Sequence, residues 1–118
     1  MRVLICGDRD WVDDEKIDKV LRELHGTEKV ELVIEGGARG ADSIGRQAAT
    51  KMGIPVMEFP ANWTFYKKAA GPIRNGWMLR FGQPELVLAF HPDIRNSKGT
   101  KDMCRQASKA GVEVRFFR

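Results

Sequence analysis

The chain has 118 residues, 42% of them hydrophobic and 31% charged, and a formal net charge of +4. These values predict one globular domain over residues 1–118 and exclude a disordered or fibrous chain. No apolar run approaches the roughly 20 residues that span a bilayer, and charges directly follow the short apolar start, unlike in a signal peptide. We therefore expect a cytoplasmic protein without a membrane partner, whose positive charge mildly favours an anionic ligand.

The first half of the chain alternates between strand and helix patterns. Residues 2–7 form a short apolar run, which is typical of a buried strand. Acidic residues followed by an apolar stripe of helical spacing predict a helix over residues 13–25, which Gly26 would end in a left-handed conformation. Residues 30–35 predict a second strand, and residues 41–52 predict a second helix.

The second half continues the alternation. Residues 54–59 predict a third strand, and an aromatic and basic connection follows over residues 62–70. Pro72 is suited to the first position of the next helix, because its missing N–H is not needed there. The remaining pattern is a strand, a polar loop, a helix and a final strand, at residues 86–90, 91–98, 99–110 and 112–116.

This order of elements determines the expected fold class and the place of the site. Strands that alternate with helices imply parallel βαβ units. We therefore expect an α/β protein, a single Rossmann-like three-layer domain with a mainly parallel five-stranded sheet. In such open sheets, ligands bind beyond the carboxyl ends of the strands, near the switch point of the topology.

The loop at residues 35–42 is the strongest candidate binding element. Its glycines allow a sharp turn and a close approach to a ligand, although a tight turn alone would also need small residues. The N–H groups of the following helix attract an anion, and Arg39 offers forked donors to phosphate. Asp42 would contact a ribose hydroxyl, orient Arg39 or cap the helix, and it is the candidate catalytic carboxylate of an enzyme. The candidate ligand-binding residues here are Gly36, Gly37, Ala38, Arg39, Gly40 and Asp42.

The loop after the first strand is the second candidate. Gly7 permits a close approach, Arg9 can contact an anion, and Trp11 could stack on a base. The alternative is structural: Trp11 would cover the edge of the sheet, and Arg9 would pair with Asp8 or Asp10.

Two further loops precede helices and carry polar donors. Arg74 and Asn75 would fall in the first turn of a helix, beside its positive dipole end, unless they face solvent. Lys98, Gly99 and Thr100 would offer charge, backbone N–H groups and a hydroxyl to phosphate, unless Thr100 only caps its helix. The candidate ligand-binding residues of these loops are Asn62, Trp63, Arg74, Asn75, Lys98, Gly99 and Thr100.

Metal and nucleophile motifs are missing from the sequence. Cys6 and Cys104 have no metal-type spacing, and we interpret them as buried free thiols. No Ser-His-Asp or Cys-His arrangement is evident, and His25 and His91 have no obvious catalytic partner. We therefore expect no metal and no further cofactor.

Several short motifs, taken together and in order, carry a family resemblance. They lie at residues 7–11, 36–42, 59–63, 69–75 with Met78, 89–90, and 98–100 with Met103. With these, the chain resembles the SLOG superfamily, in its small YspA-like branch, over nearly its whole length. The resemblance implies a Rossmann-like fold that binds nucleotides or compounds derived from them.

The wider superfamily spans enzymes and binding proteins, and the resemblance leaves this choice open. It includes the LOG phosphoribohydrolases, DprA, which binds single-stranded DNA, and sensor domains for nucleotide signals. The LOG enzymes carry the motif PGGxGTxxE. Gly99 and Thr100 match its Gly-Thr element, but Met103 stands where the catalytic glutamate would be, which argues against LOG-type hydrolysis.

Three functions follow from these observations. The first is binding of a nucleotide or a nucleotide-derived phosphoribosyl ligand at the carboxyl edge of the sheet, by a sensor or sequestering module. The second is a nucleotide N-glycosidase, which would need a carboxylate such as Asp42, Asp8 or Asp93 near the sugar. The third is binding of single-stranded nucleic acid by aromatic and basic side chains. A homo-oligomer is possible, since small Rossmann-like domains pair through helix faces.

Overall fold

Five short apolar segments form one sheet in the computed structural model, which describes residues 1–118. The strands are β1 (Arg2–Gly7), β2 (Leu32–Glu35), β3 (Val56–Glu58), β4 (Leu86–Phe90) and β5 (Glu113–Phe117). All neighbouring pairs are parallel, and the strand order is β3-β2-β1-β4-β5. After β1 the chain adds β2 and β3 on one side of it, and then crosses to the other side of β1 to add β4 and β5. The topological switch point therefore lies between β1 and β4.

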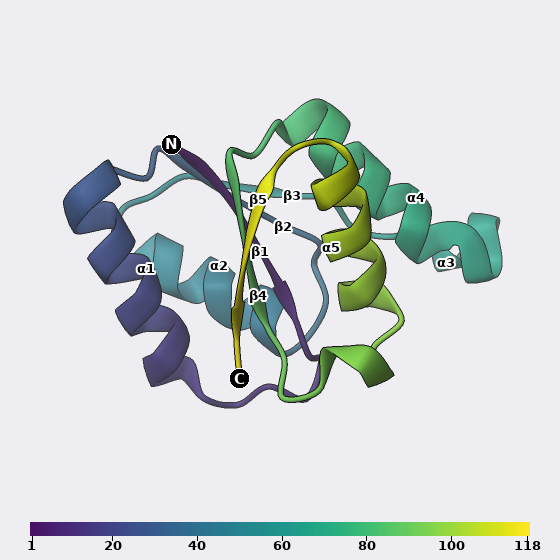
Figure 1. Ribbon diagram of the computed structural model, residues 1–118, viewed down its shortest axis with the longest axis horizontal. Coiled ribbons are helices and arrows are strands. Elements are labelled where there is room, and N and C mark those ends of the chain that lie inside the picture. Colours follow the sequence, from purple (N-terminus) through teal and green to yellow (C-terminus); the bar gives the residue numbers. More distant parts are fainter.

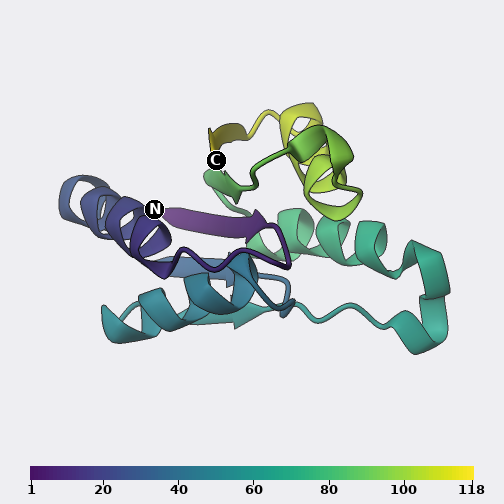
Figure 2. The ribbon, with the colours of Figure 1, turned by 90° about the horizontal axis from the view of Figure 1, so that it is seen from below.

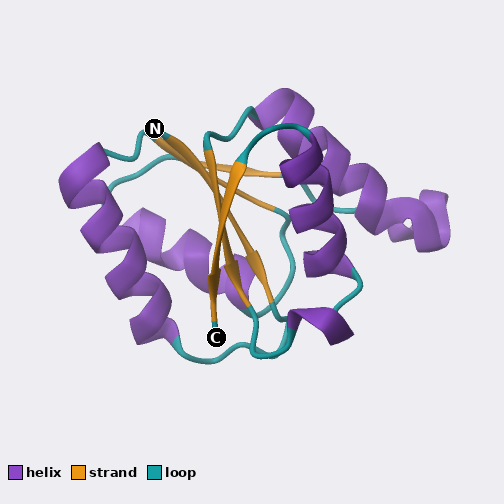
Figure 3. Ribbon diagram, viewed as in Figure 1, coloured by secondary structure: helices purple, strands orange, loops and turns teal.

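Helices cover both faces of this sheet, so the domain has three layers (Figures 1 and 3). The helices are α1 (Asp14–Glu28), α2 (Ala41–Lys51), α3 (Trp63–Tyr66), α4 (Ala70–Trp77) and α5 (Gly99–Lys109). Short 3₁₀ turns lie at Lys67–Ala69 and Ile94–Asn96, and a π-helical turn at Met78–Gly82 extends α4. Helices α1 and α2 pack on one face, and α4 and α5 pack on the other (Figure 1). The predicted α/β, Rossmann-like, five-stranded fold is confirmed.

The alternation of side chains along the strands produces two cores. In β1, Val3 and Ile5 point to the α1–α2 face, while Leu4 and Cys6 point to the α4–α5 face. All five residues of β4 are buried, as expected for a parallel strand that is covered on both sides. The sheet thus needs apolar residues at consecutive positions, which is why the sequence shows runs rather than a strict alternation.

Several predicted element boundaries are wrong by a few residues. Helix α1 continues through Gly26 to Glu28, and Lys29 ends it with a positive φ of 53° and an N–H that donates to the His25 carbonyl. Pro72 is the third residue of α4 rather than the first, because the connection before it folds into α3 and a 3₁₀ turn. Arg74 consequently lies in the middle of α4, outside the first turn.

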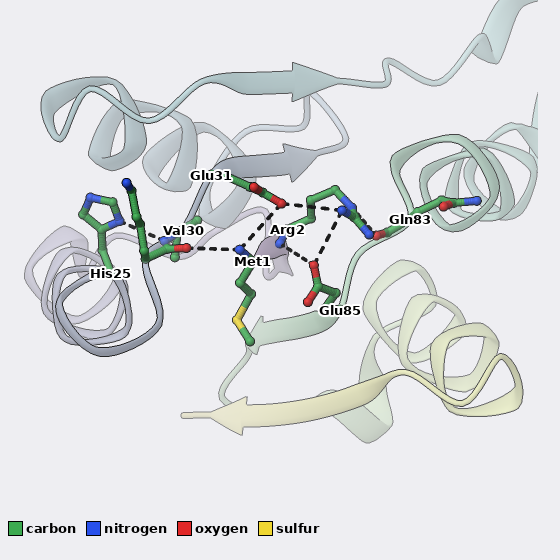
Figure 4. A network of polar contacts seen from close by, with 8 residues as sticks. Met1, Arg2, His25, Val30, Glu31, Gln83 and Glu85 are labelled. Carbon is green, nitrogen blue, oxygen red and sulfur yellow. Dashed lines mark hydrogen bonds and ion pairs between the residues drawn. The ribbon is translucent and has the colours of Figure 1, made fainter.

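A network of charges closes the amino-terminal edge of the sheet (Figure 4). The α-amino group of Met1 donates to the Lys29 carbonyl at 3.1 Å and lies 3.7 Å from Glu31. The Arg2 guanidinium lies 3.5 Å from Glu31 and 3.6 Å from Glu85. These groups neutralise one another, so the carboxyl edge is the end of the sheet that offers polar groups to a ligand. No helix has both the length and the apolar character that crossing a membrane requires.

Candidate functional site: a cleft at the carboxyl edge of the sheet

A cleft of about 670 Å³ opens at the carboxyl ends of β1 and β4. This volume is within the range of small-molecule sites in proteins. Segments from five parts of the chain line it: residues 6–10, 38–42, 63–78, 91 and 96–103. The cleft therefore lies at the switch point, where this topology is expected to bind ligands.

The loop after β1 and the loop after β2 interlock at the rim of this cleft. The Ala41 N–H donates to the Asp8 carbonyl at 3.1 Å. Gly40 has a φ of +76°, and a Cβ there would lie 2.3 Å from the same carbonyl oxygen. Gly7 is just as confined, because a Cβ on it would lie 2.1 Å from the Phe90 carbonyl oxygen. These glycines bring the two loops and β4 together rather than forming a free phosphate cradle.

Asp42 occupies the centre of the glycine-rich loop. Its Oδ2 accepts the Gly36 N–H at 3.0 Å and the Ala38 N–H at 3.4 Å. The side chain is buried, yet it still lines the cleft. Burial raises the pKa of Asp42 to about 6, against the lowering effect of the Arg74 guanidinium and of the two backbone N–H groups. This carboxylate thus occupies two N–H groups of the glycine-rich loop that could otherwise contact a ligand.

Arg74 ties α4 to this loop from inside the protein. Its Nη1 donates to the Gly36 carbonyl at 2.6 Å, and its Nε donates to the Asn75 Oδ1 at 3.0 Å. Asn75 in turn donates to the Gly99 carbonyl at 3.3 Å and to the Asp102 carboxylate at 3.0 Å. A continuous chain of hydrogen bonds therefore connects the glycine-rich loop to the start of α5.

Glu35 is a buried carboxyl group at the root of the same loop. Its Oε1 accepts the Gly37 N–H at 2.7 Å, whereas its Oε2 has no hydrogen-bond partner. Glu58 stands beside it in the next strand. Burial raises the pKa of Glu35 to about 7, and the Glu58 and Asp42 carboxylates add to this effect. Glu35 is therefore largely protonated below neutral pH, and this proton limits the cost of burying it.

The start of α5 forms the opposite wall of the cleft. Ser97 Oγ accepts the Thr100 N–H at 3.0 Å, so Ser97 acts as the cap of this helix. Lys98, Gly99 and Thr100 all line the cleft. The first N–H groups of a helix have no partner within the helix and favour an anion. At this helix, the backbone N–H groups and the positive charge of Lys98 lie at the same wall of the cleft.

Aromatic and basic side chains cover the outer part of the cleft. The Arg9 guanidinium lies 5.3 Å from the centre of the Trp63 ring, within the range of a cation–π contact. Arg39 forms an exposed ion pair with Asp10 at 3.3 Å. To bind a ligand, Arg39 would have to give up this ion pair with Asp10. Exposed ion pairs of this kind contribute little free energy.

The structure brings most of the predicted ligand-binding residues together. Eleven of them line the cleft: Gly7, Arg9, Ala38, Arg39, Asp42, Trp63, Arg74, Asn75, Lys98, Gly99 and Thr100. Gly36 and Gly37 line a smaller neighbouring hollow. Asn62 caps α3 by accepting the Phe65 N–H at 3.0 Å.

Trp11 belongs to the core and lies outside both hollows. Its ring meets the Phe90 ring edge-on at 5.7 Å, and its Nε1 donates to the Asp13 carbonyl at 2.8 Å. The structural alternative for Trp11 is therefore the one that the structure supports. Arg9 instead contacts Trp63, a pairing between distant parts of the chain that no local pattern indicated.

Other lining residues were not singled out from the sequence. His91 follows β4 directly, and its Nδ1 accepts the Asp93 N–H at 2.9 Å, which leaves Nε2 to carry the proton. Lys68 joins from the 3₁₀ turn before α4. His91 could have been found from the sequence, because it directly follows a parallel strand. The place of Lys68 at the cleft could not, because it depends on how α4 crosses the edge of the sheet.

The cleft floor contains a thiol but no metal-binding cluster. Cys6 lines the cleft, and both it and Cys104 are free and buried, as predicted. A hydrogen bond that the Cys6 thiol donates to Cys104, together with burial, holds the pKa of Cys6 above its usual range. No group of three or more His, Cys, Asp or Glu side chains is arranged to hold a metal ion.

Comparisons with known proteins agree with this architecture. The model of the family described as "YspA, cpYpsA-related SLOG family" matches residues 1–66. The Gene 61 protein of Mycobacterium phage D29 is 40% identical over 122 residues, which cover 98% of this chain and 95% of that protein. The crystal structure of DNA processing protein A (DprA) from Streptococcus pneumoniae matches 98% of this chain with a TM-score of 0.75 and 18% identity. This chain covers 49% of the DprA chain, and the likeness concerns the fold alone. The chain belongs to the YspA, cpYpsA-related SLOG family.

Proposed function

We propose that the cleft binds a nucleotide or a nucleotide-derived phosphoribosyl ligand, as a sensor or sequestering module. The observation that carries this proposal is that the start of α5, with Lys98, opens into the same cleft as Trp63 beneath Arg9. The first supplies helix N–H groups and a charge to a phosphate, and the second supplies a flat ring to a base. Membership of the SLOG family supports this class of ligand.

The phosphate belongs at α5 in this proposal, rather than at the glycine-rich loop. The Gly36 and Ala38 N–H groups already donate to Asp42, and that carboxylate would repel a phosphate at close range. The first N–H groups of α5 donate to no carboxylate, and Asp102 in its first turn instead accepts hydrogen bonds from the Asn75 and Gln106 side chains. Asp42 then lies on the sugar side of the ligand.

Isothermal titration with AMP, ADP, ATP, ADP-ribose and NAD tests the proposal. We expect at least one of them to bind, and Lys98→Glu to raise its Kd by about tenfold or more, as loss of a charged hydrogen bond implies. The matched control is Lys51→Glu, on the exposed end of α2 outside the cleft, which should bind normally. If no compound binds, the proposed function is wrong, and if both variants bind equally well, the phosphate site is misplaced.

Hydrolysis of the N-glycosidic bond of the bound nucleotide is a second candidate function. The environment of Asp42 is the observation that favours it. A carboxyl group that lines a cleft and has a pKa of about 6 could transfer a proton near neutral pH. Met103, which is buried, stands at the position of the LOG glutamate, so Asp42 would have to act without it. Chromatography after incubation with each ligand would reveal free base, and its loss in Asp42→Asn would support catalysis. Absence of free base from the wild-type protein would exclude this activity on the ligands tested.

A further inference from the structure

One stretch of the chain carries its entire net charge. The 26 residues from 59 to 84 contain four basic residues and no acidic one. All 16 acidic residues lie elsewhere, together with 16 of the 20 basic residues, so the rest of the chain is neutral overall. Arg74 is buried, which leaves Lys67, Lys68 and Arg80 as the exposed charges of this stretch.

The same stretch also displays most of the exposed aromatic surface. It contains six of the ten aromatic residues of the chain. Five of these form a surface that we call the aromatic arm: Trp63, Phe65, Tyr66, Trp77 and Phe81. Phe65 is 73% exposed and Phe81 is 60% exposed. Side chains of this size are normally buried, so their exposure needs a reason.

Three members of the aromatic arm adjoin one another in space. The Phe65 and Tyr66 rings lie 4.8 Å apart, and the Tyr66 and Trp77 rings lie 6.0 Å apart. Phe81 lies four residues after Trp77, in the π-helical turn that extends α4. The Arg80 guanidinium lies 5.5 Å from the centre of the Phe81 ring. Three rings therefore lie in a row, and a positive charge lies over the ring of a fourth.

This row extends away from the core of the domain. Figure 2 shows α3 at the end of α4, well beyond the strands. Lys67 has a positive φ of 54° where α3 ends, and it turns the chain back towards α4. Lys68 and Trp63 also line the cleft, so the aromatic arm continues from the rim of the nucleotide site.

We propose that the aromatic arm binds single-stranded nucleic acid. Bases stack on aromatic faces whatever their sequence, while interleaved lysines and arginines follow the phosphates. Protein–protein interfaces are depleted in lysine at their centre. In the aromatic arm, however, Lys67 directly follows Tyr66. The absence of any acidic residue over residues 59–84 complements a polyanion. This binding surface goes beyond the cleft, because Phe65, Trp77 and Phe81 are not part of the cleft.

Fluorescence anisotropy with a labelled oligothymidylate of 12 nucleotides tests the proposal. We expect Phe65→Ala and Phe81→Ala each to raise the Kd by at least about fivefold. Lys67→Glu should weaken binding and reduce the slope of log K against log salt by about 0.7. The controls are Phe116→Ala, an exposed aromatic on β5, and Lys51→Glu on α2, which should bind as the wild type does.

The remaining outcomes decide against the proposal. No binding at low salt, or equal losses in the control variants, would overturn it. If the aromatic arm variants change the mass of the particle in light scattering but leave oligonucleotide binding unchanged, the surface instead contacts a second copy of the chain. Lys67→Glu replaces an exposed side chain and should fold normally, so the test does not depend on the aromatic variants. A cleft variant such as Lys98→Glu separates this result from a failure of nucleotide binding.

Discussion

Arg74 holds the site together from within α4. It donates to the Gly36 carbonyl and to Asn75, and it faces the buried Asp42 carboxylate. The sequence indicated an arginine near the cleft, but it could not show that its donors are used inside the protein. Arg39 has the opposite placement, since it is exposed and paired only with Asp10.

These placements predict different costs of removing the two arginines. Arg74→Met should lower the free energy of unfolding in urea by about 3 kcal/mol, because it removes two buried hydrogen bonds, to the Gly36 carbonyl and to Asn75, and the positive charge that acts on the buried Asp42 carboxylate. Arg39→Met should cost less than about 1 kcal/mol, as an exposed pair does. Adding Asp42→Asn to Arg74→Met should recover part of the loss. Equal stability of the two single variants would contradict this role of Arg74.

Glu35 gives the protein a pH-dependent stability. Its pKa is raised from the ordinary 4.5 to about 7, so the folded protein binds more protons than the unfolded chain between these values. The free energy of unfolding must therefore fall as the pH rises through this window. Asp42 adds a similar fall between its ordinary 3.8 and about 6.

Glu35→Gln isolates the contribution of this group. The amide keeps an acceptor for the Gly37 N–H and cannot ionise, so the variant should exceed the wild type by about 2–3 kcal/mol at pH 8. At pH 4 the two proteins should be nearly equal. Urea unfolding across this pH range measures the difference. A variant that is less stable than the wild type at pH 8 would show that the Glu35 carboxylate stabilises the fold.

At the scale of elements, the number, type and order of strands and main helices were predictable from apolar periodicity. Short irregular elements were not, because α3 and the 3₁₀ turn after it depend on capping by Asn62 and on contacts with α4. The end of α1 was misplaced because Gly26 has no special backbone conformation and Lys29 takes the positive φ instead. Glycine alone therefore did not indicate where this helix ends.

Two helical glycines have different roles, and alanine substitution distinguishes them. At Gly45 in α2, a Cβ would lie 2.8 Å from the Ile5 Cγ2, so this glycine allows the helix to approach the sheet. Gly26 in α1 has no atom within 4 Å of that position. Gly45→Ala should destabilise the protein by about 1–3 kcal/mol through overpacking, whereas Gly26→Ala should stabilise it by about 0.5–1 kcal/mol. Thermal unfolding of both variants would show whether the signs differ as stated.

At the scale of the whole molecule, the topology explains why sequence motifs far apart form one cleft. Every strand runs in the same direction, so the loops after β1, β2 and β4 meet at one edge. This much followed from the βαβ order. The contacts across the cleft did not, because the Arg9–Trp63 and Asn75–Asp102 pairs join residues from different loops and helices. Local patterns contain no information on such pairs.

Backbone amide NMR is the sharpest test of whether a nucleotide binds at the carboxyl edge of the sheet. In a titration with AMP and ADP-ribose, we expect shifts of the amides at residues 8–10, 38–40 and 97–101, with little change at residues 30–32 and 83–85 on the opposite edge. Inorganic phosphate should shift the 97–101 group alone. If the shifts are confined to the opposite edge, or if neither nucleotide causes any at millimolar concentration, no nucleotide binds at the carboxyl edge.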